Sequence, residues 1–310
     1  GENVFVPAVM EHIELAGIHS GDSACILPSR NLTKDQVETI RDYTSRIAKE
    51  MHVVGLMNMQ YAIEDGEGYV LEANPRASRT VPLVSKVCNI KMVKLATDIM
   101  TSYLTGRPSP VPALKEKKIP HYGVKMPVFP FKMFPEVDPV LGPEMRSTGE
   151  VLGMSTSVGE AIYKAQEATQ TRLPSSGTVL LSVNDKDKIE LIEVARGFYE
   201  CGFTLMGTGR TCDVMVAAGL PAEKVCKINE GRPNILDKIT NGEVAIIINT
   251  PNDKKGRGDD SYIRKAAVKA KIPYFTNMAA AKATVQALRS IKKNGHLEVK
   301  SLQEFHSEIQ

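Results

Sequence analysis

The chain has 310 residues, 42% hydrophobic and 24% charged, which is the composition of globular domains and excludes disordered and fibrous proteins. At about 150 residues per domain, this length predicts two domains. A net charge of +3 and the absence of Trp exclude the basic face and the base-stacking surface typical of nucleic-acid-binding proteins.

Cysteine usage and hydropathy predict a cytoplasmic protein that does not enter a membrane. The five cysteines are scattered without a C-x-x-C pair, so neither a disulfide framework nor a zinc ribbon is indicated. The longest apolar runs, such as 244–248, are far shorter than the roughly 18 residues that a spanning helix needs. No targeting segment opens the chain, and we expect it to be a fragment of a longer protein.

The first predicted element is a helix at 33–51. Thr33 and Gln36 have the spacing of a capping box, and apolar residues then recur on one face. Two strands at 55–63 and 68–74 follow, joined by a turn at 64–67 whose Asp-Gly step favours a tight hairpin.

This hairpin brings oxygen-bearing side chains together. If the turn is centred on Gly66, Gln60 lies opposite Glu72, and Asn74, two residues further on, points the same way. Hard cations such as Mg²⁺ prefer oxygen ligands and are often completed by substrate phosphates. The spacing therefore indicates a possible metal site on one face of the hairpin.

Two arginines follow the hairpin at once. Guanidinium groups suit phosphate oxygens, so Arg76 and Arg79 complete the set of groups that phosphoryl transfer uses. The alternative is that Gln60 and Glu72 form a solvated cross-strand pair and that the arginines face water. Spacing alone leaves both interpretations open.

The middle of the chain is rich in proline. Nine of the 18 prolines fall within 108–143, which predicts an irregular connecting segment. Beyond residue 175, short β-rich runs alternate with helical ones, a pattern that predicts a parallel sheet covered by helices. A helix at 186–201 is expected to bury Ile189 and Phe198, and 253–260 is expected to form a surface loop. The predicted strands are 178–183, 203–206, 225–228, 244–249 and 274–276.

A glycine-containing turn at 207–211 joins the second of these strands to a helix. Such turns let backbone N–H groups reach a phosphate at a helix N-terminus. The run lacks the third glycine of G-x-G-x-x-G and is not a Walker loop. A flexible turn without a ligand is the alternative.

Four runs of sequence resemble the large chain of the carbamoyl phosphate synthase family, and the resemblance extends over nearly the whole chain. The runs are HIELAGIHSGDS at 12–23, MNMQ at 57–60, LEANPRASRT at 71–80 and GPEMRSTGEV at 142–151. The resemblance implies an α/β and α+β chain in two parts. Residues 1–170 would form the C-terminal lobe of an ATP-grasp domain with an antiparallel sheet, and 171–310 a methylglyoxal-synthase-like allosteric domain with a doubly wound parallel sheet.

The resemblance also implies a function and partners. The first part would belong to the half that phosphorylates carbamate with ATP, giving carbamoyl phosphate for pyrimidine and arginine biosynthesis. Ammonia would come from glutamine hydrolysed on a glutaminase small chain, and the full enzyme would be an oligomer. The family's ATP site also needs an upstream lobe with a glycine-rich loop, which 1–12 lacks, so we expect this chain to be inactive without the remainder of the large chain.

Carried over by position, the family's functional residues in this first part fall into four groups. Arg76 and Arg79 would hold phosphate or carbamate, and Mg²⁺ or Mn²⁺ would be bound by Gln60, Glu72 and Asn74. ATP would be lined by Gly17, Ile18, His19, Ser20, Gln60 and Glu72, and K⁺ by His12, Glu14, Ile18 and Ser20. Alternatively, the run 12–20 only faces solvent; a zinc site of His12, Glu14, His19 and Cys25 fits no established spacing.

In the second part, the resemblance implies a regulatory site for a nucleotide monophosphate such as UMP or IMP. Its residues would be Lys188, Thr208, Thr211, Lys227 and Asn249. The alternative function for the chain is a stand-alone nucleotide-monophosphate-binding module. The two functions differ at Glu72 and Asn74, because a sensor has no use for a divalent metal on the hairpin.

Overall fold

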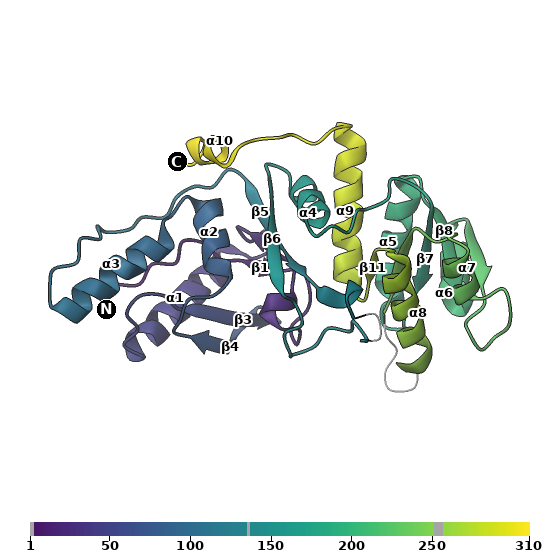
Figure 1. Cartoon of the computed structure of the whole chain (residues 1–310), viewed down its shortest axis with the longest axis horizontal. Helices are drawn as coiled ribbons and strands as arrows, with labels where there is room; N and C mark the ends of the chain where they lie inside the picture. Colours follow the sequence, from purple (N-terminus) through teal and green to yellow (C-terminus); the bar gives the residue numbers. More distant parts are fainter. Residues whose placement is uncertain (1–2, 135–136, 251–256) are drawn as a thin grey trace.

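The computed structural model describes residues 3–134, 137–250 and 257–310. These residues form a two-stranded hairpin, a four-stranded antiparallel sheet and a five-stranded parallel sheet, arranged along the long axis of the molecule (Figure 1). Of the predicted loop at 253–260, residues 253–256 lie outside the described residues, and the prediction is wrong for 257–260, which form the start of a helix. The elements up to the proline-rich segment are β1 (Glu11–His12), η1 (Ser20–Asp22), β2 (Cys25–Leu27), α1 (Lys34–Glu50), β3 (Asn58–Glu64), β4 (Glu67–Asn74), α2 (Thr80–Cys88) and α3 (Met92–Thr105).

The predicted first helix and hairpin are present. The Thr33 hydroxyl accepts from the Gln36 N–H at 3.2 Å and the Gln36 side chain accepts from the Thr33 N–H at 2.9 Å, so the capping box forms and α1 begins one residue later. The hairpin lies against α1, and the hydroxyls of Thr44 and Tyr61 are 2.8 Å apart. Local sequence therefore sets the start of α1, whereas a tertiary contact places the hairpin beside it.

The prediction that 108–143 is irregular is wrong for its centre. β5 (Tyr122–Val128) lies there, in the interior of the antiparallel sheet, whose order is β1-β2-β5-β6. Its one proline, Pro127, lies beyond the stretch that pairs with β2, which is 123–125, so the missing N–H leaves no pairing with β2 unmet. The segment continues through η2 (Pro130–Lys132), and β6 (Gly149–Ser155) and α4 (Val158–Ala168) follow.

The parallel sheet is doubly wound, as expected. Its order is β11-β10-β7-β8-β9, so the chain begins in the middle, runs outward to β9 and then returns to the other side of β7. Its elements are β7 (Thr178–Ser182), α5 (Lys188–Glu200), β8 (Thr204–Thr208), α6 (Gly209–Ala217), β9 (Ala222–Val225), α7 (Ile235–Thr240), β10 (Ile246–Asn249), α8 (Arg257–Ala270), β11 (Tyr274–Phe275), α9 (Met278–Asn294) and α10 (Leu302–Ser307).

Two details of this half differ from the prediction. The strand expected at 225–228 lies at Ala222–Val225, because its pairing with β8 ends where Thr208 meets Val225. Ile189 is 88% exposed, since it lies in the first turn of α5, whose buried face is formed by Leu191, Val194 and residues further along the helix.

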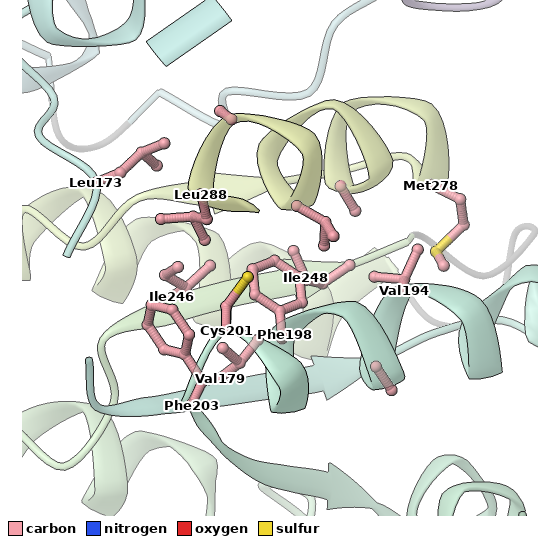
Figure 2. Packing of buried hydrophobic residues seen from close by; sticks show 14 of the residues in the cluster. Leu173, Val179, Val194, Phe198, Cys201, Phe203, Ile246, Ile248, Met278 and Leu288 are labelled. Atoms are coloured by element: carbon pink, nitrogen blue, oxygen red, sulfur yellow. The ribbon is translucent and has the colours of Figure 1, made fainter. Parts of the chain in front are cut away.

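The two sheets share one hydrophobic core. Ile26 and Val124 of the antiparallel sheet belong to the same buried cluster as Ile162 of α4 and the inner face of the parallel sheet. In Figure 2, Leu288 and Met278 of α9 lie over Phe198 and Ile248, so α9 covers the parallel sheet while it also packs on α4. The core therefore continues across the predicted boundary at residue 170, and the division into two domains stays a prediction.

The end of the chain returns to the first half. The side-chain Nε2 of His306 in α10 is 2.6 Å from the Lys86 carbonyl of α2, and Gln310 exchanges backbone hydrogen bonds with Lys118. Figure 1 shows α10 lying over α2, far from the parallel sheet that precedes it in sequence. Among the helices of the described residues, none is both long and apolar enough to cross a membrane.

The contact between β6 and α4 can be tested at one glycine. A Cβ atom on Gly153 would lie 2.2 Å from the Ala161 carbonyl oxygen and 2.4 Å from the Ala165 nitrogen, both backbone atoms of α4. We expect Gly153→Ala to force α4 away from the sheet and to lower the free energy of unfolding by about 3 kcal/mol in urea denaturation. Gly149→Ala on the same strand, where nothing lies within 4 Å, is the control and should change little. Equal stability of the two variants would contradict this packing.

Candidate functional site

The hairpin pairs two of the predicted metal ligands, although its turn and its register near the turn differ from the predicted ones. Gln60 lies opposite Glu72, as expected. The turn, however, contains only Asp65 and Gly66, whose φ values of 51° and 86° are those of a type I′ turn. This turn alone would place Gln60 opposite Leu71; a β-bulge at Leu71 adds one residue to β4 and restores the pair.

The pairing places four oxygen-bearing side chains on one face. Asn74 lies opposite Asn58, and both are two residues from the pair formed by Gln60 and Glu72. Glu72 is exposed and the other three are half-buried. Asn58 is absent from the predicted set, although the alternation of the strand already indicates it. Carboxylate and amide oxygens in this arrangement fit a divalent cation that keeps room for water and phosphate ligands.

Arg76 and Arg79 differ in exposure and in hydrogen-bond partners. Arg76 is exposed, and its Nη1 donates to the Ala77 carbonyl at 3.1 Å. Arg79 is half-buried just before α2, and its Nη2 donates to the Ser147 hydroxyl at 2.9 Å. A Cβ atom on Gly21 would lie 2.6 Å from that Nη2 and 3.1 Å from His19 Nδ1. The fold therefore brings Arg79 against the predicted nucleotide-lining run 17–20, whereas Arg76 remains free to meet a ligand.

A buried carboxylate, that of Asp22, fixes the position of the run 17–20. Asp22 is fully buried and accepts the backbone N–H groups of Arg146 and Ser147, both at 2.8 Å. The His19 N–H donates to the Gly142 carbonyl at 2.8 Å, and His19 Nδ1 accepts from the Gly21 N–H at 3.0 Å. Segment 142–147 thus works as a strap over the loop. His19 has its Nδ1 committed to the backbone, which argues against a role as general base through that atom.

The predicted potassium ligands lie beside a buried lysine. Burial and the charge of Lys125 lower the pKa of His12 to about 4, whereas burial raises the pKa of Glu14 to about 7. Lys125 is 1% exposed and donates to the Ser20 carbonyl at 2.8 Å. No residue pattern predicts Lys125, because an isolated lysine in a strand ordinarily faces solvent.

These groups suit an alkali cation in part. A neutral imidazole, a buried carboxylate and backbone carbonyls are acceptable donors, and a cation would neutralise Glu14; it would share the Ser20 carbonyl with the Lys125 ammonium. A zinc site of His12, Glu14, His19 and Cys25 finds no support, since within the described ranges no three His, Cys, Asp or Glu residues are grouped to hold a metal.

The strap also reaches the parallel-sheet half. Arg146 Nη1 donates to the Asp138 carbonyl at 2.6 Å. The Asp138 carboxylate accepts Nε and Nη2 of Arg264 in α8, at 2.8 and 2.7 Å, and Arg264 is 3% exposed. Tyr274 of β11 donates to the Pro139 carbonyl at 3.4 Å. Buried bidentate pairs of this kind fix geometry, so the candidate nucleotide loop and the parallel sheet are joined through 138–147.

A second candidate site lies at the carboxyl ends of the parallel strands. The Thr208 hydroxyl donates to Ser182 Oγ at 3.0 Å, and Asn249 Nδ2 donates to the Ser182 carbonyl at 3.2 Å. Thr211, in the first turn of α6, has its hydroxyl 3.3 Å from the Val183 N–H. Here β7 lies beside β10, at the point where the strand order switches from one side of β7 to the other. Open α/β sheets bind ligands at such topological switch points. The predicted set does not contain Ser182.

Cationic side chains surround this end of the sheet. Lys188 begins α5 and pairs with the Asp185 carboxylate, which also forms an ion pair with Arg210 Nη1 at 3.2 Å. The charge of Lys227 acts on the same carboxylate, and together these cations lower the pKa of Asp185, the hydrogen bond from Lys188 contributing most. Lys188, Thr208, Thr211, Lys227 and Asn249 are thus collected at one edge, together with Arg210, which the predicted set lacks.

Two protein families match the chain. A carbamoyl-phosphate synthase L chain, ATP binding domain model matches residues 1–104, and an MGS-like domain model matches residues 190–276. The predicted fold class is confirmed: the antiparallel sheet belongs to the ATP-binding part and the parallel sheet to the MGS-like part.

Curated relatives match the chain from end to end. Carbamoyl phosphate synthase large chain of Archaeoglobus fulgidus is 50% identical over 99% of this chain and 28% of its own length. The C-terminal section of the large chain of Aquifex aeolicus is 45% identical over 99% of this chain and 60% of that section, and a Methanosarcina barkeri large chain is 43% identical over all of this chain and 77% of its own length. The chain therefore spans less than a third of the first of these relatives.

The half-buried residues His12 and Glu14 together predict an unusual pH dependence. The native pKa of Glu14, about 7, exceeds its ordinary 4.5, so the native state binds more protons and stability falls as pH rises between these values. The native pKa of His12, about 4, is below its ordinary 6.5, so its effect is the opposite, and the two partly cancel between pH 4.5 and 6.5.

We expect Glu14→Gln to remove the loss of stability that the Glu14 carboxyl causes as pH rises. The variant should gain stability as pH rises to about 6.5 and should exceed the wild type at pH 8 by roughly 3 kcal/mol. Urea denaturation at pH 5 to 8 in potassium-free buffer measures this, with the exposed Glu50→Gln as control. Parallel curves for wild type and Glu14→Gln would contradict the burial of a destabilising carboxylate.

Proposed function

The chain belongs to the family of carbamoyl phosphate synthase large chains, as the C-terminal region with an ATP-binding domain and an MGS-like domain, and from this premise we propose that it forms half of the site that phosphorylates carbamate. The observation that carries the proposal is the pairing of Gln60 with Glu72, with Asn74 on the same face of the hairpin. An ATP-dependent ligase needs such a face for the metal that accompanies the nucleotide.

Gln60, Glu72 and Asn74 are the residues that would hold Mg²⁺ or Mn²⁺. The bound cation would neutralise the charge of the terminal phosphates of ATP. Glu72 contributes the negative charge that attracts the cation, and the amides contribute neutral oxygens, so the face does not repel the triphosphate as three carboxylates would. The bulge at Leu71 is what keeps Glu72 on this face.

The arginines and the loop have complementary roles in the proposed reaction. Arg76, exposed and bonded only locally, binds the incoming carbamate or the transferred phosphoryl group, whereas Arg79 holds the loop and presents its remaining N–H groups to the same anion. Gly17, Ile18, His19 and Ser20 line the nucleotide, and Gly17, with φ of 104°, gives the loop its turn. Positioning and charge neutralisation suffice for phosphoryl transfer, so no histidine base is required.

Potassium is proposed at His12, Glu14, Ile18 and Ser20. The support is the buried Glu14 carboxyl, for which the fold supplies a backbone N–H from Ala24 at 2.7 Å but no bonded cation among its described contacts. A potassium ion there would stabilise the loop that lines the nucleotide.

The remainder of the large chain is the proposed partner of the hairpin. Tyr69, Val70 and Leu71 are 52%, 44% and 49% exposed, and apolar side chains at this density on a hairpin suit burial against another lobe. That lobe would carry the glycine-rich loop over the phosphates, so this chain by itself should form no carbamoyl phosphate. A glutaminase small chain, an oligomeric full enzyme, a cytoplasmic location and roles in pyrimidine and arginine biosynthesis complete the proposal.

The parallel-sheet end is the proposed site of allosteric control by UMP or IMP. Its support is the convergence of Lys188, Lys227 and the hydroxyls of Thr208 and Thr211 at the strand ends. A stand-alone nucleotide-binding module is the second candidate function, favoured by this same convergence. The hairpin ligands distinguish the two, because only the ligase needs them.

We expect Glu72→Gln in the complete large chain, assembled with its glutaminase, to lower carbamoyl phosphate synthesis at least about 100-fold, since the metal loses its charged ligand. Binding of Mn²⁺ with ATP, followed by electron paramagnetic resonance, should weaken in parallel. Glu67→Gln at the other end of β4 is the matched control and should keep full activity. Full activity of Glu72→Gln would refute the ligase site and favour the module.

We expect calorimetric titration of this chain to show binding of UMP or IMP that Lys227→Ala weakens about 10- to 100-fold, the effect of losing one charge-assisted hydrogen bond to phosphate. Lys224→Ala is the control, because Lys224 lies only three residues before Lys227 but forms a surface ion pair with Asp213. Equal, weak responses to UMP, IMP and MgATP would contradict the regulatory site.

A further inference from the structure

One carboxylate lies among the cations of the proposed effector site. Asp185 follows β7 and pairs with Lys188 Nζ and with Arg210 Nη1, and it also lies in the field of Lys227. These cations come from three successive strand ends, after β7, β8 and β9. The arrangement is that of a phosphate site in which a side-chain carboxylate occupies the place of the anion.

Carboxylate and phosphate oxygens use the same donors. The N–H groups of Lys188 and Arg210 that bond Asp185 are therefore unavailable to a ligand phosphate until the pairs open. The pairs do open at low cost, because the Asp185 side chain is 61% exposed and surface ion pairs contribute little. Lys188, by contrast, is only 16% exposed, so its position is set by the fold and either anion must come to it.

We propose that Asp185 is a built-in competitor of the effector, which holds Lys188 and Arg210 in the ligand-free site and lowers its affinity for phosphate monoesters. The inference rests on the proposed binding of nucleotide monophosphates at this edge of the sheet. Three cations against one carboxylate leave an excess of positive charge, so a phosphate dianion gains more from the cluster than Asp185 does. Arg210 is thereby assigned to the phosphate-binding set.

The test is calorimetric titration of this chain with inorganic phosphate, UMP and IMP at an ionic strength of about 0.1 M. Asp185→Asn should bind all three about three- to tenfold more tightly than the wild type, since a negative charge near the phosphate is lost. Asp185→Glu keeps the charge and should bind as the wild type does. Asp42→Asn is the matched control, because Asp42 is also 61% exposed and ion-paired, but on α1.

The salt dependence gives a second readout. The advantage of Asp185→Asn should shrink at about 0.5 M salt, where charge effects beyond roughly 4 Å are screened. Unchanged or weaker binding by Asp185→Asn, with wild-type binding still sensitive to Lys227→Ala, would overturn this inference and leave the effector site intact. No binding of any probe by wild type or variant would overturn both.

Discussion

The buried carboxylate of Asp22 is the contact on which the first half of the molecule depends. It is fully buried, and two backbone N–H groups, of Arg146 and Ser147, supply its described hydrogen bonds. A buried carboxylate without donors costs several kcal/mol, so the strap at 142–147 must lie over the loop that carries Asp22. The Ser147 hydroxyl then accepts a hydrogen bond from Arg79, and the Gly142 carbonyl accepts one from the His19 N–H. These hydrogen bonds thus hold together three parts of the sequence, near residues 20, 79 and 145.

The same strap gives the two candidate sites a physical connection. Arg146 holds the Asp138 carbonyl while Asp138 holds Arg264 of α8, and the second half also shares its core with the first through α4 and α9. Packed and hydrogen-bonded contacts therefore run from the parallel-sheet half to the candidate nucleotide loop. Allostery is a coupling free energy between two sites, and contiguous contacts of this kind are one physical route by which two sites can be coupled.

Some of the site could be read from spacing and some of it only from folded geometry. Alternation along two strands predicts that Gln60, Glu72 and Asn74 share a face, and Asn58 follows from the same rule. The pairing of Gln60 with Glu72 was predicted correctly for an incomplete reason, because the shorter turn and the bulge at Leu71 compensate for one another; nearer the turn, the pairing of 61–64 with 67–70 is shifted by one residue from the prediction. Asp22, Lys125 and Asp185 carry no local signal. Each acquires its role from a partner more than 100 residues away or from several strand ends at once.

The sequence alone determined the local features: the capping box of α1, the Asp-Gly turn, and the alternation of strands and helices that is typical of a parallel sheet. They involve neighbours a few residues apart, whose geometry the backbone imposes wherever the segment lies. The tertiary structure decided the rest. β5 forms inside the proline-rich segment because β2 and β6 supply its partners, and Lys125 can be buried because the Ser20 carbonyl accepts a hydrogen bond from its ammonium group. Pairing and burial depend on which distant groups the fold brings together, and no short stretch of sequence contains that information.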